Sequence, residues 1–116
     1  MRMDQENIIL KKTVGFALEI IRYAELLESK KKFVLGNQLL KSGTSIGANV
    51  HEAQNAESKN DFIHKFKIAA KEVEETQYWL TLCTVAESYP DCSKLVSDLT
   101  EIEKIINKII TTSKRK

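Results

Sequence analysis

Residues 38–52 read QLLKSGTSIGANVHE, and the fold depends on whether the backbone stays helical through the SGTSIG segment at 42–47. Glycine costs a helix about 1 kcal/mol relative to alanine, and Ser and Thr compete for backbone hydrogen bonds, so a loop is one reading of this segment. The apolar spacing favours a helix, because Leu39, Ile46 and Val50 keep one helical phase across it. Small side chains also let a second helix approach closely. We therefore predict one continuous helix over about 33–57.

Helical spacing extends to both sides of this segment. Residues 4–29 carry apolar side chains at alternating steps of four and three, which predicts a helix. A second row widens that stripe, as expected for a helix packed against two neighbours, and consists of Leu10, Val14, Ala17, Ile21 and Ala24. Ser58 and Asp61 form a capping pattern that opens a third run, to about residue 87. Its seam comprises Phe62, Phe66, Ala69, Val73, Thr76, Leu80 and Cys83.

The single proline, Pro90, separates the third run from the fourth, because the residue before a proline is pushed out of the helical region. The fourth run has a strict apolar seam that ends near residue 112 and comprises Leu95, Leu99, Ile102, Ile106 and Ile109. Runs of matched length with short links favour antiparallel neighbours. We therefore predict an all-α fold, an antiparallel up-down-up-down four-helix bundle formed by residues 1–116 as a single domain.

Composition excludes several classes of protein. A chain of 116 residues with 42% hydrophobic and 29% charged residues is typical of one soluble globular domain. No apolar run reaches the roughly 20 residues that span a bilayer, and the N-terminus lacks the order of a secretory signal, so we expect a cytoplasmic protein without a membrane partner. Cys83 and Cys92 then read as free thiols, although a disulfide across a helix-helix turn is the alternative.

No residue pattern indicates catalysis or a cofactor. Di-iron bundles use two Glu-x-x-His motifs, and the nearest approach is the single DFIH segment at 61–64. His64 shares its helical face with Asn60, Lys67 and Lys71, which predicts a solvated side chain. Neither Ser45 nor Cys83 has a His and acid setting, and no phosphate-binding loop is present. We expect no enzyme activity, no metal, no cofactor and no small-molecule substrate.

Three sets of residues are candidates for binding or structural roles. The first set is an apolar flank beside the third seam and comprises Trp79, Leu82 and Ala86. It is interpreted either as an oligomer interface or as the edge of a wide core stripe. The second set is a candidate nucleic-acid surface and comprises Lys11, Lys12, Arg22, Lys65, Lys67 and Lys71. Because glutamates lie among these cations, the alternative interpretation is an ordinary exposed face. The third set is a polar edge of the second helix and comprises Ser45, Asn49 and Glu52. Its side chains either form structural hydrogen bonds or make a ligand site, and we favour the structural role.

The segments 38–52 and 58–62 together resemble the signature of the bacterial four-helix bundle proteins named after intervening sequences in 23S ribosomal RNA genes. The resemblance covers nearly the whole chain. Its pattern has a Gln-Leu, a Ser-Ile, an Ala-Asn and a Ser-Lys before an apolar third helix. His51 and Ala53 replace the usual Ala and Gly, and Gly47 stands where proline is common.

This resemblance implies a four-helix bundle that frequently assembles as a homopentamer and has no established catalytic activity. Relatives include accessory proteins of diversity-generating retroelements, which bind nucleic acid and a reverse transcriptase through basic surfaces. For this chain the resemblance implies a homo-oligomer with a role as a scaffold or an RNA-related accessory factor, and RNA or DNA as candidate partners. The formal net charge of only +2 argues against strong phosphate binding.

Overall fold

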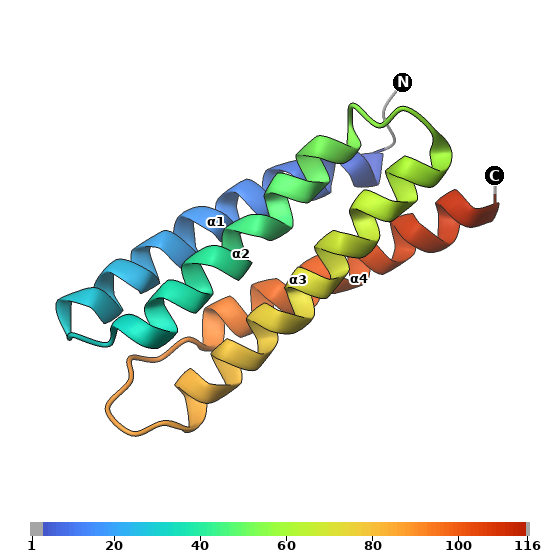
Figure 1. Cartoon of the computed structure of the whole chain (residues 1–116). Coiled ribbons are helices and arrows are strands. Elements are labelled where there is room, and N and C mark those ends of the chain that lie inside the picture. The colour runs from blue at the N-terminus through green and yellow to red at the C-terminus, as the bar shows by residue number, and fades with distance from the viewer. Residues whose placement is uncertain (1–3, 116) are drawn as a thin grey trace.

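Four helices build the chain, in a computed structural model that describes residues 4–115. They are α1 (Asp4–Ser29), α2 (Phe33–Ala53), α3 (Lys59–Val85) and α4 (Ser93–Arg115). The described residues contain no β-strand, which confirms the all-α prediction. Figure 1 shows the four helices lying lengthwise in one elongated body, whose principal extents are 48 × 20 × 19 Å. α1 and α3 each have α2 and α4 as neighbouring helices, so α1 and α3 lie on opposite corners.

The SGTSIG segment is helical throughout, as predicted, because it is the place where α1 and α2 come closest. Gly43 is buried against Ile20, and a Cβ at this position would lie 2.8 Å from Cγ1 and 2.9 Å from Cγ2 of Ile20. Gly47 is buried against Thr13, whose Cβ would be 3.1 Å from an added Cβ. The glycines that weaken α2 by propensity therefore allow the close packing that stabilises it.

The turns between the helices follow local sequence signals. After α1, Lys31 has a left-handed φ of 62°, and the amides of Lys31 and Lys32 donate to the Glu28 and Leu27 carbonyls at 2.9 and 2.8 Å. This is a Schellman ending in which lysine takes the place usually held by glycine. At the start of α3, the Ser58 hydroxyl accepts from the Asp61 amide at 3.0 Å, which confirms the predicted cap.

Some predicted helix ends were wrong by a few residues. α2 ends at Ala53 rather than near 57, because the amides of residues 54–56 donate to carbonyls three residues back and tighten the chain into turns. α3 ends at Val85 rather than near 87, since Ala86 is extended (φ −68°, ψ 136°) and Ser88 has a left-handed φ of 69°. α4 continues past 112 to Arg115.

Buried side chains from all four helices form one apolar cluster, and its members are largely the predicted seams. On α3 the seam from Phe66 to Cys83 is buried, but Phe62 is only half-buried and its neighbour Ile63 is buried instead. On α1 the second row does not pack as a unit. Ala24 is buried and Leu10, Ala17 and Ile21 are half-buried, whereas Val14 is 49% exposed.

We predict that Gly43→Ala destabilises the protein by about 1–2 kcal/mol, because the steric cost of overpacking exceeds the gain of about 1 kcal/mol in helix propensity. Urea unfolding followed by circular dichroism measures this. The matched control is Gly15→Ala on α1, where an added Cβ meets nothing within 4 Å. Gly15→Ala should stabilise by about 0.5–1 kcal/mol. Equal effects of the two substitutions would contradict the close approach at Gly43.

Candidate functional site

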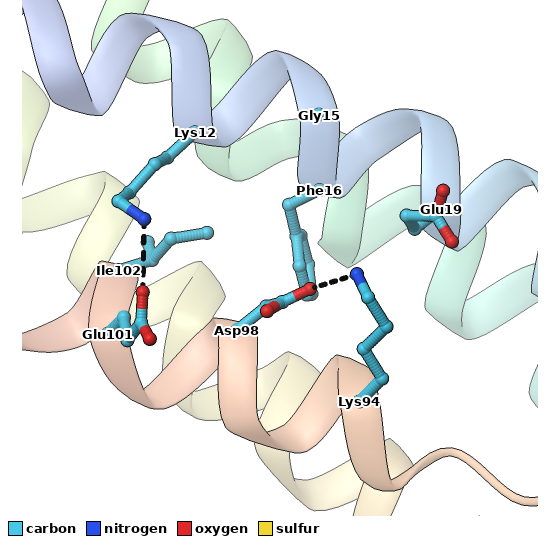
Figure 2. A pocket seen from close by; sticks show the side chains of 8 residues that line it. All are labelled: Lys12, Gly15, Phe16, Glu19, Lys94, Asp98, Glu101 and Ile102. Carbon is cyan, nitrogen blue, oxygen red and sulfur yellow. Dashed lines mark hydrogen bonds and ion pairs between the residues drawn. The ribbon is translucent and has the colours of Figure 1, made fainter.

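A shallow groove of about 280 Å³ runs between α1 and α4, and five charged side chains line it. Phe16 and Ile102 are buried and form its apolar floor, and Gly15 leaves room above them. Figure 2 shows Lys12 of α1 reaching Glu101 of α4, with Nζ 3.0 Å from Oε2. The groove is therefore bridged by one ion pair between the helices.

Further charged side chains line the same groove. Figure 2 also shows Lys94 and Asp98 pairing within α4, with Nζ 3.0 Å from Oδ2. The hydrogen bond and the charge of Asp98 raise the pKa of Lys94, and Glu19 adds to this. Glu19 itself accepts from Arg22 at 2.7 Å. Because these charges are partly exposed and paired with one another, the groove offers no unpaired acid, base or nucleophile.

A second groove lies on the other side of α4 and is apolar. It has a volume of about 410 Å³, and its walls include Leu80, Val85, Val96 and Leu99. The threonine hydroxyls at this groove donate to carbonyls of their own helices, at 2.8 Å for Thr81 and Thr84 and 3.0 Å for Thr100. The three threonine hydroxyls are thus engaged by their own helices, and Gln77 is the remaining polar side chain of a largely apolar lining.

The predicted basic residues do not gather into one surface. Lys12, Arg22 and Lys65 each pair with a carboxylate, that of Glu101, Glu19 and Glu52 respectively. Lys67 and Lys71 are exposed on α3, at the corner opposite the α1 helix that carries Lys11. The sequence shows how many cations there are, but the packing of the helices decides which of them meet.

The apolar flank on α3 is less exposed than we would expect for an oligomer interface. Trp79, Leu82 and Ala86 are all half-buried, and Trp79 packs against the core of this chain. The Trp79 ring meets Tyr78 edge-on at 5.2 Å between centroids, and its buried Nε1 has no hydrogen-bond partner among residues 4–115. A role of this flank in assembly stays a prediction.

The polar edge of α2 is satisfied by its own helix. Ser45 donates to the Lys41 carbonyl at 2.7 Å, and Asn49 donates to the Ser45 carbonyl at 2.9 Å. Glu52 is exposed and lies 3.4 Å from Lys65 of α3. These contacts fit the structural role that the sequence favoured, because no side chain of the three projects an unpaired polar group into a cavity.

A buried polar contact between α2 and α3 lies one turn from this edge. The hydroxyls of Ser42 and Thr76 are hydrogen-bonded to one another at 2.9 Å. Both residues are buried, with exposed fractions of 1% and 0%. Thr76 also donates to the Glu72 carbonyl at 2.7 Å. Burial raises the pKa of the Glu72 carboxyl, Glu75 raises it further, and Lys41 opposes them. This contact fixes α2 against α3 at one register.

Sequence reasoning missed two surfaces. Seven of the ten exposed large apolar side chains belong to α1 or α2, so the main apolar exposure is not on the Trp79 flank. The residues that carry it are Val14, Leu18, Ile21, Phe33 and Leu40, of which Ile21 is half-buried, and we call them the α1–α2 apolar surface. The second is a basic stripe on α4, where Lys104, Lys108 and Arg115 are exposed and form no ion pair within residues 4–115. Their spacing of four and seven was the signal available in the sequence.

Within residues 4–115, no three His, Cys, Asp or Glu side chains gather where they could hold a metal ion. His64 is exposed, as its helical face predicted. None of the described helices is long and apolar enough to cross a membrane.

The family model of the 23S rRNA-intervening sequence protein matches residues 5–108. The chain belongs to this family. A solved crystal structure of a family relative from Bacteroides thetaiotaomicron, described as a protein with unknown function from the S23 ribosomal protein family, is 42% identical. It superposes with a TM-score of 0.87, over 92% of this chain and 98% of the relative. No curated protein matches the chain. The family description names no reaction, and the function of the solved relative is likewise unassigned.

We predict that Thr76→Val destabilises the protein by about 1–2 kcal/mol, because it leaves the buried Ser42 hydroxyl without its partner on α3. The matched control is Thr100→Val, at an exposed threonine whose hydroxyl bonds only to its own helix. That change should stay within about 0.5 kcal/mol. Chemical unfolding of both variants measures the difference, and a difference of zero would show that the Ser42–Thr76 contact does not stabilise the bundle.

Proposed function

We propose that this protein is a non-enzymatic, cytoplasmic scaffold that assembles with copies of itself and serves as an RNA-related accessory factor. The observation that carries the proposal is the α1–α2 apolar surface. Membership of the 23S rRNA-intervening sequence protein family supports the link to RNA. The paired charges in the α1–α4 groove support a role other than catalysis.

The α1–α2 apolar surface is continuous across two helices. Val14, Leu18 and Ile21 lie at helical spacing on α1, and Phe33 and Leu40 lie two turns apart on α2. Ile21, Phe33 and Leu40 line one shallow depression together, which joins the two rows. Exposures of 49% for Val14, 53% for Leu18 and 52% for Phe33 leave apolar area in water. A contiguous patch of this kind favours association, since a second copy would remove it from solvent.

We infer that consecutive helices alternate in direction, as in the up-down-up-down arrangement. The support is the order of contacts, which reverses along the α1–α2 pair and along the α2–α3 pair. On α1 and α2 the contacts are Gly36 against Leu27, Gly43 against Ile20 and Gly47 against Thr13. On α2 and α3 they are Ser42 with Thr76 and Glu52 with Lys65. This arrangement leaves the outer faces of α1 and α2 side by side along the molecule, which suits a ring of copies such as the homopentamer common in relatives.

Light scattering after size exclusion tests the assembly. We expect a multiple of the 13.2 kDa chain for the wild type, with five copies as the family-based expectation. Leu18→Glu should shift the mass toward 13.2 kDa, because a carboxylate cannot be buried unpaired between subunits. The matched control is Val85→Glu, at an α3 residue that is 77% exposed and lies outside this surface. A wild-type monomer at micromolar concentration, or an equal effect of both variants, would rule out this interface.

A second candidate function is a nucleic-acid-binding accessory module, and the basic stripe on α4 favours it. Lys104, Lys108 and Arg115 share the outer face of α4, and none of them forms an ion pair with residues 4–115. Lys and Arg in the last turn also favour the helix dipole, which is the purely structural account of Arg115. Lys104 and Lys108 lie further back and gain little from the dipole. A row of unpaired cations is suited to a phosphate backbone.

A titration of labelled single-stranded RNA tests this candidate, at salt concentrations from about 50 to 200 mM. We expect weak binding that falls with salt. The double variant Lys104→Gln/Lys108→Gln should weaken it and lower the slope of log K against log salt by about 1.5, because two phosphate contacts are lost. The matched control is Lys30→Gln/Lys31→Gln at the turn after α1. Binding that is absent at the lowest salt, or independent of salt, would exclude this function.

A further inference from the structure

The two cysteines lie on either side of the connection between α3 and α4, and the fold brings them to one place. Cys83 is in the last turns of α3, and Cys92 immediately precedes α4. Cys92 Sγ lies 3.3 Å from Thr84 Oγ1 and 3.7 Å from the Leu80 carbonyl oxygen. Both atoms belong to the turn of α3 that carries Cys83. Cys92 therefore packs against the same stretch of helix from which the second thiol projects.

Tyr23 of α1 connects the two thiols. Its hydroxyl donates to the Pro90 carbonyl at 2.7 Å, which ties the 86–92 connection to α1. Burial raises the pKa of the Tyr23 phenol, and the neighbouring Cys83 and Cys92 thiols raise it further. Tyr23 and the two thiols thus belong to one buried cluster. The geometric basis for joining the sulfurs is the contact of Cys92 with the turn of α3 that carries Cys83.

A small reagent has a route to the pair. Cys83 and Cys92 are only 2% and 5% exposed, but both line a cavity of about 460 Å³ together with Tyr89 and Pro90. Burial also raises the pKa of the Cys83 thiol, so little of it is thiolate at neutral pH. The cavity therefore gives a small oxidant access to both thiols, and the reaction should be slow at neutral pH because little Cys83 thiolate is present.

We propose that Cys83 and Cys92 form an oxidisable dithiol site, at which a hydroperoxide such as hydrogen peroxide converts the two thiols into an intramolecular disulfide that locks α3 to α4. One thiolate attacks a peroxide oxygen, the O–O bond breaks, and a sulfenic acid and one water form. The second thiol then displaces the sulfenic oxygen as a second water, and the S–S bond forms. The two thiol protons end in these waters, the sulfurs are oxidised, and the peroxide is reduced.

The position of Cys92 makes the bond geometrically accessible. Residues 86–92 are not helical, so the backbone that carries Cys92 is not fixed by helical hydrogen bonds. Ser88 already has a left-handed φ of 69°, which marks this connection as irregular rather than part of a packed helix. In a reducing compartment such a disulfide is transient, and its role is to sense oxidants rather than to stabilise the fold. In the oxidised form, the disulfide would join the C-terminal end of α3 to the N-terminal end of α4.

The test treats the reduced full-length chain with hydrogen peroxide and measures its intact mass under non-reducing conditions. We expect a loss of about 2 Da without dimers, a peptide map that links residues 83 and 92, and faster reaction at pH 9 than at pH 7, because the thiolate is the nucleophile. The melting temperature should rise by on the order of 5–10 °C and return on adding a thiol reductant.

The variants Cys83→Ser and Cys92→Ser serve as matched controls, since each keeps one thiol at the site. Both should lack the mass loss and the reversible rise in melting temperature. Disulfide-linked dimers of the wild type, masses increased by oxygen atoms, or full recovery of both thiols after millimolar peroxide would each overturn the proposal. Because the wild-type chain carries the decisive measurement, the result does not depend on how well the variants fold.

Discussion

The close approach of α1 and α2 at two glycines is the constraint on which the rest of the structure depends. Gly43 lies against Ile20 and Gly47 against Thr13, with no room for a side chain at the first of these positions. Because the two backbones are this near, α2 presents Ser42 toward Thr76 of α3, and the buried hydroxyl contact can form. A helix that is poor by propensity is thus kept helical by what it packs against.

The fourth helix is held differently. It joins the others through a single apolar seam, and a groove lies on each side of it, one charged toward α1 and one apolar toward α3. In the charged groove Lys12 meets Glu101, a partly exposed pair that contributes little to stability in water. The outer face of α4 is consequently open, and it carries the basic stripe. The bundle therefore has a tightly packed α1–α2–α3 side and a more open α4 side.

These two sides divide the surface into regions of different chemistry. The α1–α2 apolar surface is suited to contact with another protein surface. The α4 stripe is suited to phosphate. The end of the bundle around Tyr23 contains the two thiols, away from the middle of the α1–α2 apolar surface. The self-association, phosphate binding and thiol oxidation that we propose would thus use different surfaces of the bundle.

The sequence by itself determined the four helices, most of their core seams and the Ser58 cap, because periodicity and capping are local properties read within a few residues of each position. It located the turn signals but missed helix ends by a few residues at 53, 85 and 115. Only the tertiary structure decided that Val14 faces solvent while Ala24 is buried. It also decided which lysines pair with carboxylates, and that Tyr23 neighbours both Cys83 and Cys92. Those facts depend on how each helix is rotated and shifted against its neighbours, and residues distant in the chain set that rotation and shift.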